Sequence, residues 1–215
     1  MESMPDIIYL VILFSLMSLI PFIAVMSTCF VKISVVLSLV RNAIGIQQIP
    51  PNMALHGISL ILTLYIMAPI GYEMFDIAQQ REFSFEKKEE LKANIDQTLV
   101  PYRGFLNKHV GSDQKEFFLD NAKEHWPKKY HSEVNDENLL ILIPSFTVTE
   151  ITKAFEIGFL LYLPFVAIDL ILSNLLLALG MMTVSPMTIS LPFKLLLFVL
   201  LDGWSRLIHG LVLSY

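Results

Sequence analysis

The sequence predicts an all-α protein in which two long, apolar helical hairpins are joined by a small, charged helical module. Of the 215 residues, 54% are hydrophobic and only 16% are charged, whereas soluble domains carry about 25% charged residues. Fourteen of the 20 acidic and ten of the 15 basic residues fall between positions 73 and 138. We therefore expect an N-terminal hairpin over 1–72, a charged module over 73–138 and a C-terminal hairpin over 139–215.

The N-terminal hairpin is predicted from two uncharged runs. Residues 7–31 contain no charge and exceed the roughly 20 apolar residues that span a bilayer. The apolar run continues to Val40, and a straight helix of that length would be about 50 Å long, which exceeds a hydrocarbon core of about 30 Å. We expect that Pro21 breaks this helix or that part of it leaves the bilayer. The second uncharged run covers 53–72.

The composition excludes several classes of protein. A disordered chain would need few apolar residues, and a net charge of −5 without a basic run disfavours a nucleic-acid partner. The single cysteine, Cys29, excludes a disulfide framework and a multi-cysteine metal site. No phosphate loop, dinucleotide fingerprint or hydrolase motif is present, so no cofactor and no catalytic site is expected. The acidic Glu2 and Asp6 and the absence of an Ala-x-Ala-like site disfavour a cleaved signal peptide.

The turn between the first two apolar runs covers 41–52. Its glycine and its proline pair forbid a continuous helix. Arg41 without an acidic neighbour places this turn on the cytoplasmic side and the charged module on the opposite side. We expect Arg41, Gln47 and Gln48 to lie at the rim of a pore or at a contact between subunits.

The C-terminal hairpin is predicted from the apolar runs 157–184 and 187–213, which a Gly–Pro-bounded loop separates. Met181, Met182 and Met187 flank this loop. Two interpretations are open: ordinary packing, or a ring of flexible apolar side chains from several subunits that seals a pore.

The charged module is predicted to be helical. Apolar residues recur with helical spacing among charged residues in two stretches, each followed by a proline. The first stretch contains Leu91, Ile95 and Leu99 and precedes Pro101; the second contains Phe118, Ala122 and Trp126 and precedes Pro127. We expect this module to pack on itself or on neighbouring subunits.

Charges within or beside the apolar runs form the second group of candidate site residues. They are Lys32, Glu150, Glu156, Asp169 and Lys194. Such charges normally face a bundle interior and pair. Structural ion pairs and an ion or proton relay are the two interpretations, and we expect Glu150 to pair with Lys194, between neighbouring subunits.

Four stretches resemble a known family. Residues 30–52 (FVKISVVLSLVRNAIGIQQIPPN), 139–158 (LLILIPSFTVTEITKAFEIG), 159–174 (FLLYLPFVAIDLILSN) and 180–195 (GMMTVSPMTISLPFKL) resemble the FliP/YscR/SctR family of type III export apparatus proteins. The closing LLLFVLLDGW is similar to its injectisome branch, SctR and YscR. The resemblance covers both apolar arms, over half of the chain.

The resemblance implies a non-enzymatic, pore-forming subunit of the export gate that passes unfolded effector and needle proteins across the bacterial inner membrane. It implies five copies of the chain in a helical cone with SctS and SctT, next to SctU and SctV, displaced from the inner membrane toward the periplasm. It also implies a pore gasket of methionines after Gly180, although Thr183 replaces the third one common in the family. An ion- or proton-coupled membrane transporter and an intramembrane enzyme are the alternatives.

Overall fold

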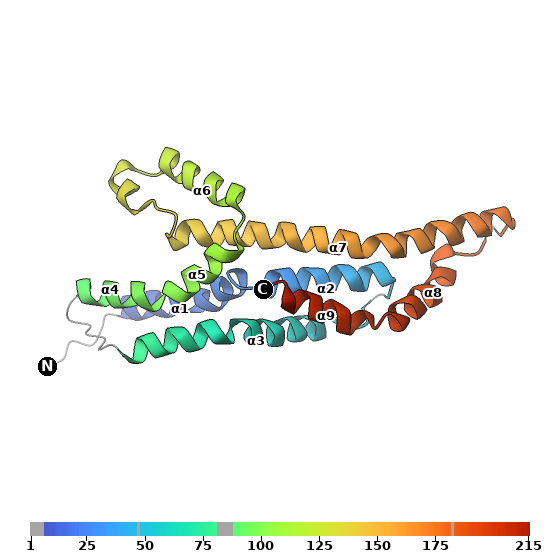
Figure 1. The fold of residues 1–215 in the computed structure, drawn as a ribbon, viewed down its shortest axis with the longest axis horizontal. Coiled ribbons are helices and arrows are strands. Elements are labelled where there is room, and N and C mark those ends of the chain that lie inside the picture. The colour runs from blue at the N-terminus through green and yellow to red at the C-terminus, as the bar shows by residue number, and fades with distance from the viewer. Residues whose placement is uncertain (1–6, 47, 81–87, 182) are drawn as a thin grey trace.

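The computed structural model describes residues 7–46, 48–80, 88–181 and 183–215. Helices dominate these residues and no strand occurs among them, which confirms the all-α prediction (Figure 1). The elements are α1 (Ile7–Met26), α2 (Phe30–Ile44), α3 (Asn52–Gln79), α4 (Lys88–Thr98), α5 (Val100–His109), α6 (Ser112–His125), the 3₁₀ helix η1 (Lys128–Glu133), α7 (Leu139–Ala178), α8 (Pro186–Leu200) and α9 (Gly203–Leu213). Most of them run along one long axis.

The first apolar run is broken, but not at Pro21. That proline lies inside α1, and the helix ends instead before Ser27, where Met17–Met26 and Phe30–Ile44 bend by 59°. Side chains distant in sequence bond to the carbonyl groups at the break: the Tyr102 hydroxyl donates to Ser27 O at 3.0 Å, and Thr147 Oγ1 donates to Met26 O at 3.0 Å. The break is therefore fixed by tertiary contacts.

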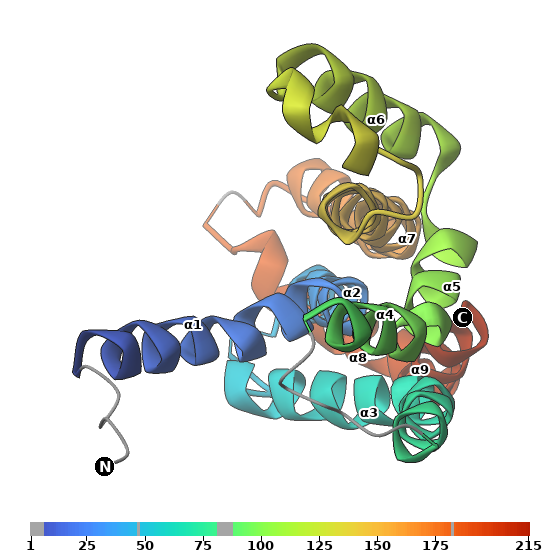
Figure 2. The same ribbon diagram turned by 90° about the vertical axis from the view of Figure 1, so that its left-hand side faces the viewer.

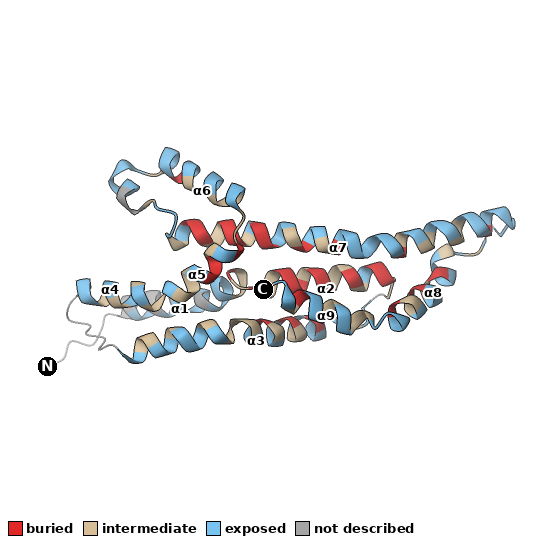
Figure 3. Cartoon of the chain, viewed as in Figure 1, coloured by how far each residue is buried: buried red, intermediate tan, exposed pale blue. Residues whose placement is uncertain are grey.

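The core lies between α2 and the first half of α7, which cross the centre of the molecule (Figure 3). Gly158 permits this approach, because a Cβ there would overlap Leu39 Cδ1 and lie 3.2 Å from Leu39 Cβ. Seen along the long axis, α1 extends away from the other helices and α6 covers α7 (Figure 2).

The described residues of the charged segment form no core of their own; of the two expected arrangements, packing on itself is not seen, and packing on neighbouring subunits stays a prediction. Its helices α5 and α6 pack on α7, and α4 packs on α3. Phe105 and Leu106 of α5 form a second apolar cluster with Leu142 and Phe146 of α7. α4 ends at Thr98, just before Pro101, as predicted. Pro101 then lies in the first turn of α5, where the N–H that a proline lacks would be unbonded anyway.

The C-terminal hairpin contains the expected loop. α7 is one helix of 40 residues, about 60 Å long. Just after its end, Gly180 adopts a left-handed backbone conformation with a φ of 70°. α8 begins at Pro186, and α8 and α9 bend by 58° at Leu201–Asp202. By length and composition, α3 and α7 could each cross a membrane, and there would be up to four spans if each bent helix pair is one span.

Candidate functional site

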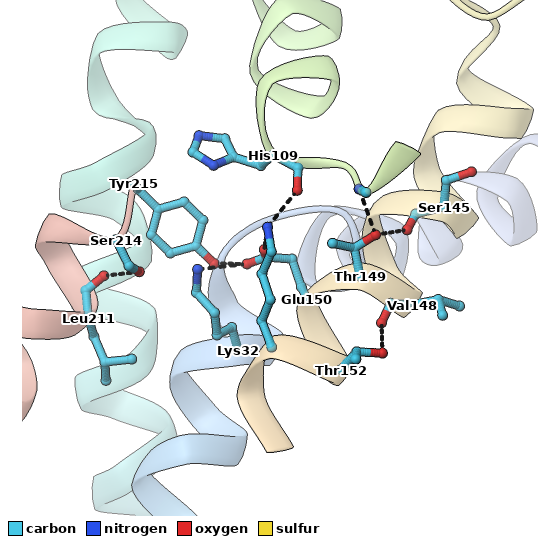
Figure 4. A network of polar contacts seen from close by, with 12 residues as sticks. Lys32, His109, Ser145, Val148, Thr149, Glu150, Thr152, Leu211, Ser214 and Tyr215 are labelled. Atoms are coloured by element: carbon cyan, nitrogen blue, oxygen red, sulfur yellow. Dashed lines mark hydrogen bonds and ion pairs between the residues drawn. The ribbon is translucent and has the colours of Figure 1, made fainter. Parts of the chain in front are cut away.

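The most buried charged group of the described residues is a carboxylate on α7. Glu150 Oε2 lies 3.2 Å from Lys32 Nζ of α2, and the two side chains are 0% and 2% exposed. The Tyr215 hydroxyl donates to the same carboxylate oxygen (Figure 4). Lys32 Nζ also lies 3.5 Å from the centre of the Tyr215 ring, a cation–π geometry. These contacts tie α2, α7 and the segment after α9 together.

A second ring of contacts joins this carboxylate to the end of α5. Lys153 Nζ lies 3.7 Å from Glu150 Oε1 and donates to the His109 carbonyl at 2.8 Å. One helical turn earlier, Thr149 Oγ1 accepts from the Gly111 N–H at 3.0 Å and donates to Ser145 O at 2.8 Å (Figure 4). The link between α5 and α6 is therefore fastened to α7 on both sides of Glu150.

The imidazole of His109 borders this network. Its ring lies 4.9 Å from that of Phe105 and 5.1 Å from that of Tyr215. Burial lowers the pKa of His109, and the neighbouring Lys108 lowers it further. The imidazole is therefore held neutral at neutral pH.

A second ion pair, in which only the lysine is buried, lies farther along α7. Lys194 Nζ of α8 lies 2.6 Å from Asp169 Oδ2 and donates to the Ala43 carbonyl at 3.2 Å. The pairing within the chain thus differs from the expected one, because Glu150 contacts Lys32 and Lys194 contacts Asp169. A pair between Glu150 and Lys194 of neighbouring copies stays a prediction.

α7 carries three carboxylates, on Glu150, Glu156 and Asp169, and they are poorly placed for a relay. The exposed Glu156 lies 13 positions before Asp169, about 20 Å along the helix axis. Glu150 and Asp169 are 19 positions apart on a continuous helix, about 28 Å along its axis, and each is engaged by a lysine. No group of three metal-ligating side chains occurs in the described residues. The arrangement fastens helices together and offers no chain of proton carriers.

The turn between α2 and α3 is closed by Arg41. Its Nη1 donates to the Pro50 carbonyl at 3.1 Å and to Asn52 Oδ1 at 2.6 Å. Gln48 is exposed and has a φ of 65°, and Gln47 lies outside the described residues. A role of this turn at a pore rim or subunit contact stays a prediction.

The two gate candidates that the structure describes, Met181 and Met187, lie just after α7 and in α8, at the end of α7 that is far from α6 (Figure 1). Met181 in the loop and Met187 in α8 are 43% and 60% exposed, and Met182 lies outside the described residues. Neither described methionine is used in the core of this chain, so both are free to contact something else.

Three residues of the Glu150 network, Tyr215, Lys153 and His109, were not among the predicted site residues. Tyr215 and His109 belong to no motif and contact residues of other helices, whereas Lys153 lies within the family-like stretch 139–158. Lys153 does lie three positions from Glu150, a spacing at which opposite charges interact on a helix; that spacing was the one usable clue.

The fold and the site define a membrane-associated helical protein whose apolar helices are joined by buried ion pairs. Residues 13–211 match the FliP family, and the chain belongs to that family, as the sequence resemblance predicted. Over all 215 residues the chain is 57% identical to Yop proteins translocation protein R of Yersinia pestis, covering 99% of it. It is 46% identical over 208 residues to hypersensitivity response secretion protein HrcR of Ralstonia nicotianae, with 96% of each chain covered. It is 47% identical over 218 residues to virulence protein YscR of Salmonella typhimurium, with 99% of each covered.

Proposed function

We propose that this chain is a pore-forming core subunit of a type III secretion export gate in the bacterial inner membrane. Five copies assemble with SctS and SctT, next to SctU and SctV, and pass unfolded effector and needle proteins. The chain acts without catalysis, cofactor or nucleic acid. The proposal is supported by family membership over residues 13–211 and by the translocation and secretion names of full-length relatives.

One structural observation carries the assembly part of the proposal. The most apolar 18-residue window of α7 is only 11% buried within the chain. A continuous exposed apolar surface marks a contact with lipid or protein. The charged helices α5 and α6 contact the first part of α7, and α8 covers one side of its second half, so the remaining surface of that half is left for the membrane or for other subunits. On this proposal the complex is displaced from the inner membrane toward the periplasm, and subunits cover this half.

Native mass spectrometry of the chain co-expressed with its neighbouring export proteins tests the assembly. We expect a complex that holds five copies of this chain together with other export proteins. A chain recovered as a single copy, without other export proteins, would contradict the proposal.

The gate is placed at Met181, Met182 and Met187. Flexible thioether side chains can close on one another and still yield to a passing polypeptide, and an apolar constriction blocks ions by dewetting. Replacing Met181 and Met182 by Ala should cause ion leak and slow growth while the complex stays assembled. Met17→Ala is the matched control, because Met17 is also exposed but lies on α1, and this variant should cause no ion leak. Loss of the complex without leak would show that these methionines only pack.

A further inference from the structure

Two opposite charges on the apolar arms have no side-chain partner in the described part of the chain. Glu156 of α7 and Arg206 of α9 are both exposed, and neither side chain forms a hydrogen bond or ion pair there. Asp202, four positions before Arg206, is not within ion-pair distance of it. Charges on apolar helices normally face the interior of a helix bundle and pair there. We therefore expect both side chains to pair with a group outside this chain.

Glu156 lies on the face of α7 that points away from the core. Ala154 and Gly158 are buried against α2, and a residue midway between two such positions lies on the opposite side of a helix. Three large exposed residues share that outward face at i+3, i+4 and i+7: Phe159, Leu160 and Leu163. The outward face is therefore an apolar ridge with one carboxylate.

Arg206 lines a groove on another surface. The groove has a volume of about 450 Å³ and lies between α7, α8 and α9. Its walls are apolar and include Leu161, Phe165, Phe198 and Leu207. Arg206 is the one charged residue in the lining of this groove in the described chain. The groove therefore matches an apolar ridge that carries one negative charge.

We propose that a second copy of this chain occupies the groove, with the outward ridge of its α7 against the groove walls and its Glu156 paired with Arg206. Ridge and groove are different surfaces of the chain, so the contact is heterologous and repeats from copy to copy until a ring closes. An amphipathic helix laid in an apolar groove is a common recognition mode. This inference rests on the proposed multi-copy gate and adds which surfaces meet.

Disulfide crosslinking in membranes, with the neighbouring export proteins co-expressed, tests the contact. Glu156→Cys and Arg206→Cys in one chain should give a ladder of crosslinked multimers after oxidation. Each single variant should remain uncrosslinked, and a mixture of the two single variants should give dimers only. All variants carry Cys29→Ala to remove the native thiol. Leu170→Cys with Arg206→Cys is the matched control, because position 170 is about 21 Å farther along α7 and should not crosslink.

Charge reversal gives a second readout. Glu156→Arg or Arg206→Glu should lower the yield of the native complex on the order of tenfold, and the double exchange should restore most of it, since close charge pairs couple strongly. Glu73→Arg, an exposed acid on α3, should leave the yield unchanged. Dimers from Arg206→Cys alone would overturn the inference in favour of a two-fold contact.

The wild-type complex separates this inference from the proposed function. If native mass spectrometry shows several copies but the cysteine pair does not crosslink, lipid or another protein fills the groove and the inference fails while the gate proposal stands. If the wild type holds a single copy, the gate proposal itself fails.

Discussion

The two halves of α7 meet very different surroundings. Eight of its ten buried residues lie at or before Gly158, and only Phe165 and Leu176 follow. The first half is covered by α2, α5 and α6 and carries the Glu150 network. The second half carries the single pair Asp169–Lys194 and ends in the methionine loop. One continuous helix therefore passes from an interior built by its own chain to a surface that needs other molecules.

This difference teaches where stability and where assembly reside. A charge that its own chain buries must be paired for the chain to fold, because an unpaired buried charge has lost its hydration without gaining a partner. A charge or apolar face left open by the chain becomes a condition for assembly. Variants in the first half should therefore act on the isolated chain, and variants in the second half on the complex.

The largest effect is expected from breaking the Glu150 network. Lys32→Ala removes the nearer and more deeply buried of the two lysines beside the Glu150 carboxylate, and removing one partner of a buried pair costs about 3 to 5 kcal/mol. Thermal unfolding of the purified chain in detergent measures the loss. Asp169→Asn is the comparison variant in the second half. It changes a side chain that is 39% exposed and leaves Lys194 its hydrogen bond to the Ala43 carbonyl, so it should cost less. Equal losses from the two variants would remove the distinction between the halves.

Two double exchanges sharpen the comparison by asking which partner Glu150 uses. Lys32→Glu with Glu150→Lys should recover part of the stability lost in either single variant, if the contact within the chain governs folding. Glu150→Lys with Lys194→Glu should recover assembly only if neighbouring copies form that pair. Unfolding is measured for the first exchange and complex yield for the second. If both single variants lose stability or complex yield and the double exchange recovers none of the loss, that result counts against the pair concerned.

A smaller effect is expected where α2 and α7 touch. The Cβ of Gly158→Ala would overlap Leu39, and overpacking costs about 1 to 3 kcal/mol, less up to about 1 kcal/mol regained in helix propensity. Gly71→Ala on α3 is the control, because nothing lies within 4 Å of a Cβ there, and it should stabilise the chain. Leu39→Ala should reduce the penalty of Gly158→Ala in the unfolding assay. A neutral Gly158→Ala would mean that Leu39 moves aside freely.

The same contrast explains what the sequence could predict. Local patterns were sufficient for the helical class, for the turn after α2 and for the loop before Pro186, because glycine and proline act on their own neighbours. The break at Ser27 was missed because Tyr102 and Thr147 bond to the carbonyl groups that it frees, and they are distant in sequence. The predicted break at Pro21 was wrong, since membrane-type helices tolerate a proline inside them.

The candidate site follows the same rule. Composition showed that isolated charges on apolar helices must pair, and Lys32, Glu150, Asp169 and Lys194 are all paired in the structure. Which lysine meets which carboxylate depends on how α2 and α8 pack on α7, and two lysines with two carboxylates allow more than one answer. Tyr215 was missed because a tyrosine carries no charge to balance and follows no spacing that points at Glu150.

The smallest expected effect is a pH dependence confined to the first half. Burial lowers the pKa of His109, and Lys108 adds to this, so the folded chain binds a proton there less readily than the unfolded chain. Stability is then complete above the unfolded pKa of about 6.5 and falls as pH drops below it. Glu150 raises the pKa of His109, and Lys32 and Lys153 each lower it by less than Glu150 raises it, but burial and Lys108 are the larger effects and the net direction is downward. His109→Phe keeps a ring between Phe105 and Tyr215 but cannot titrate. We expect the melting temperature to fall more steeply between pH 7.5 and pH 5 for the wild type than for His109→Phe. Parallel curves would mean that folding does not lower the pKa of His109.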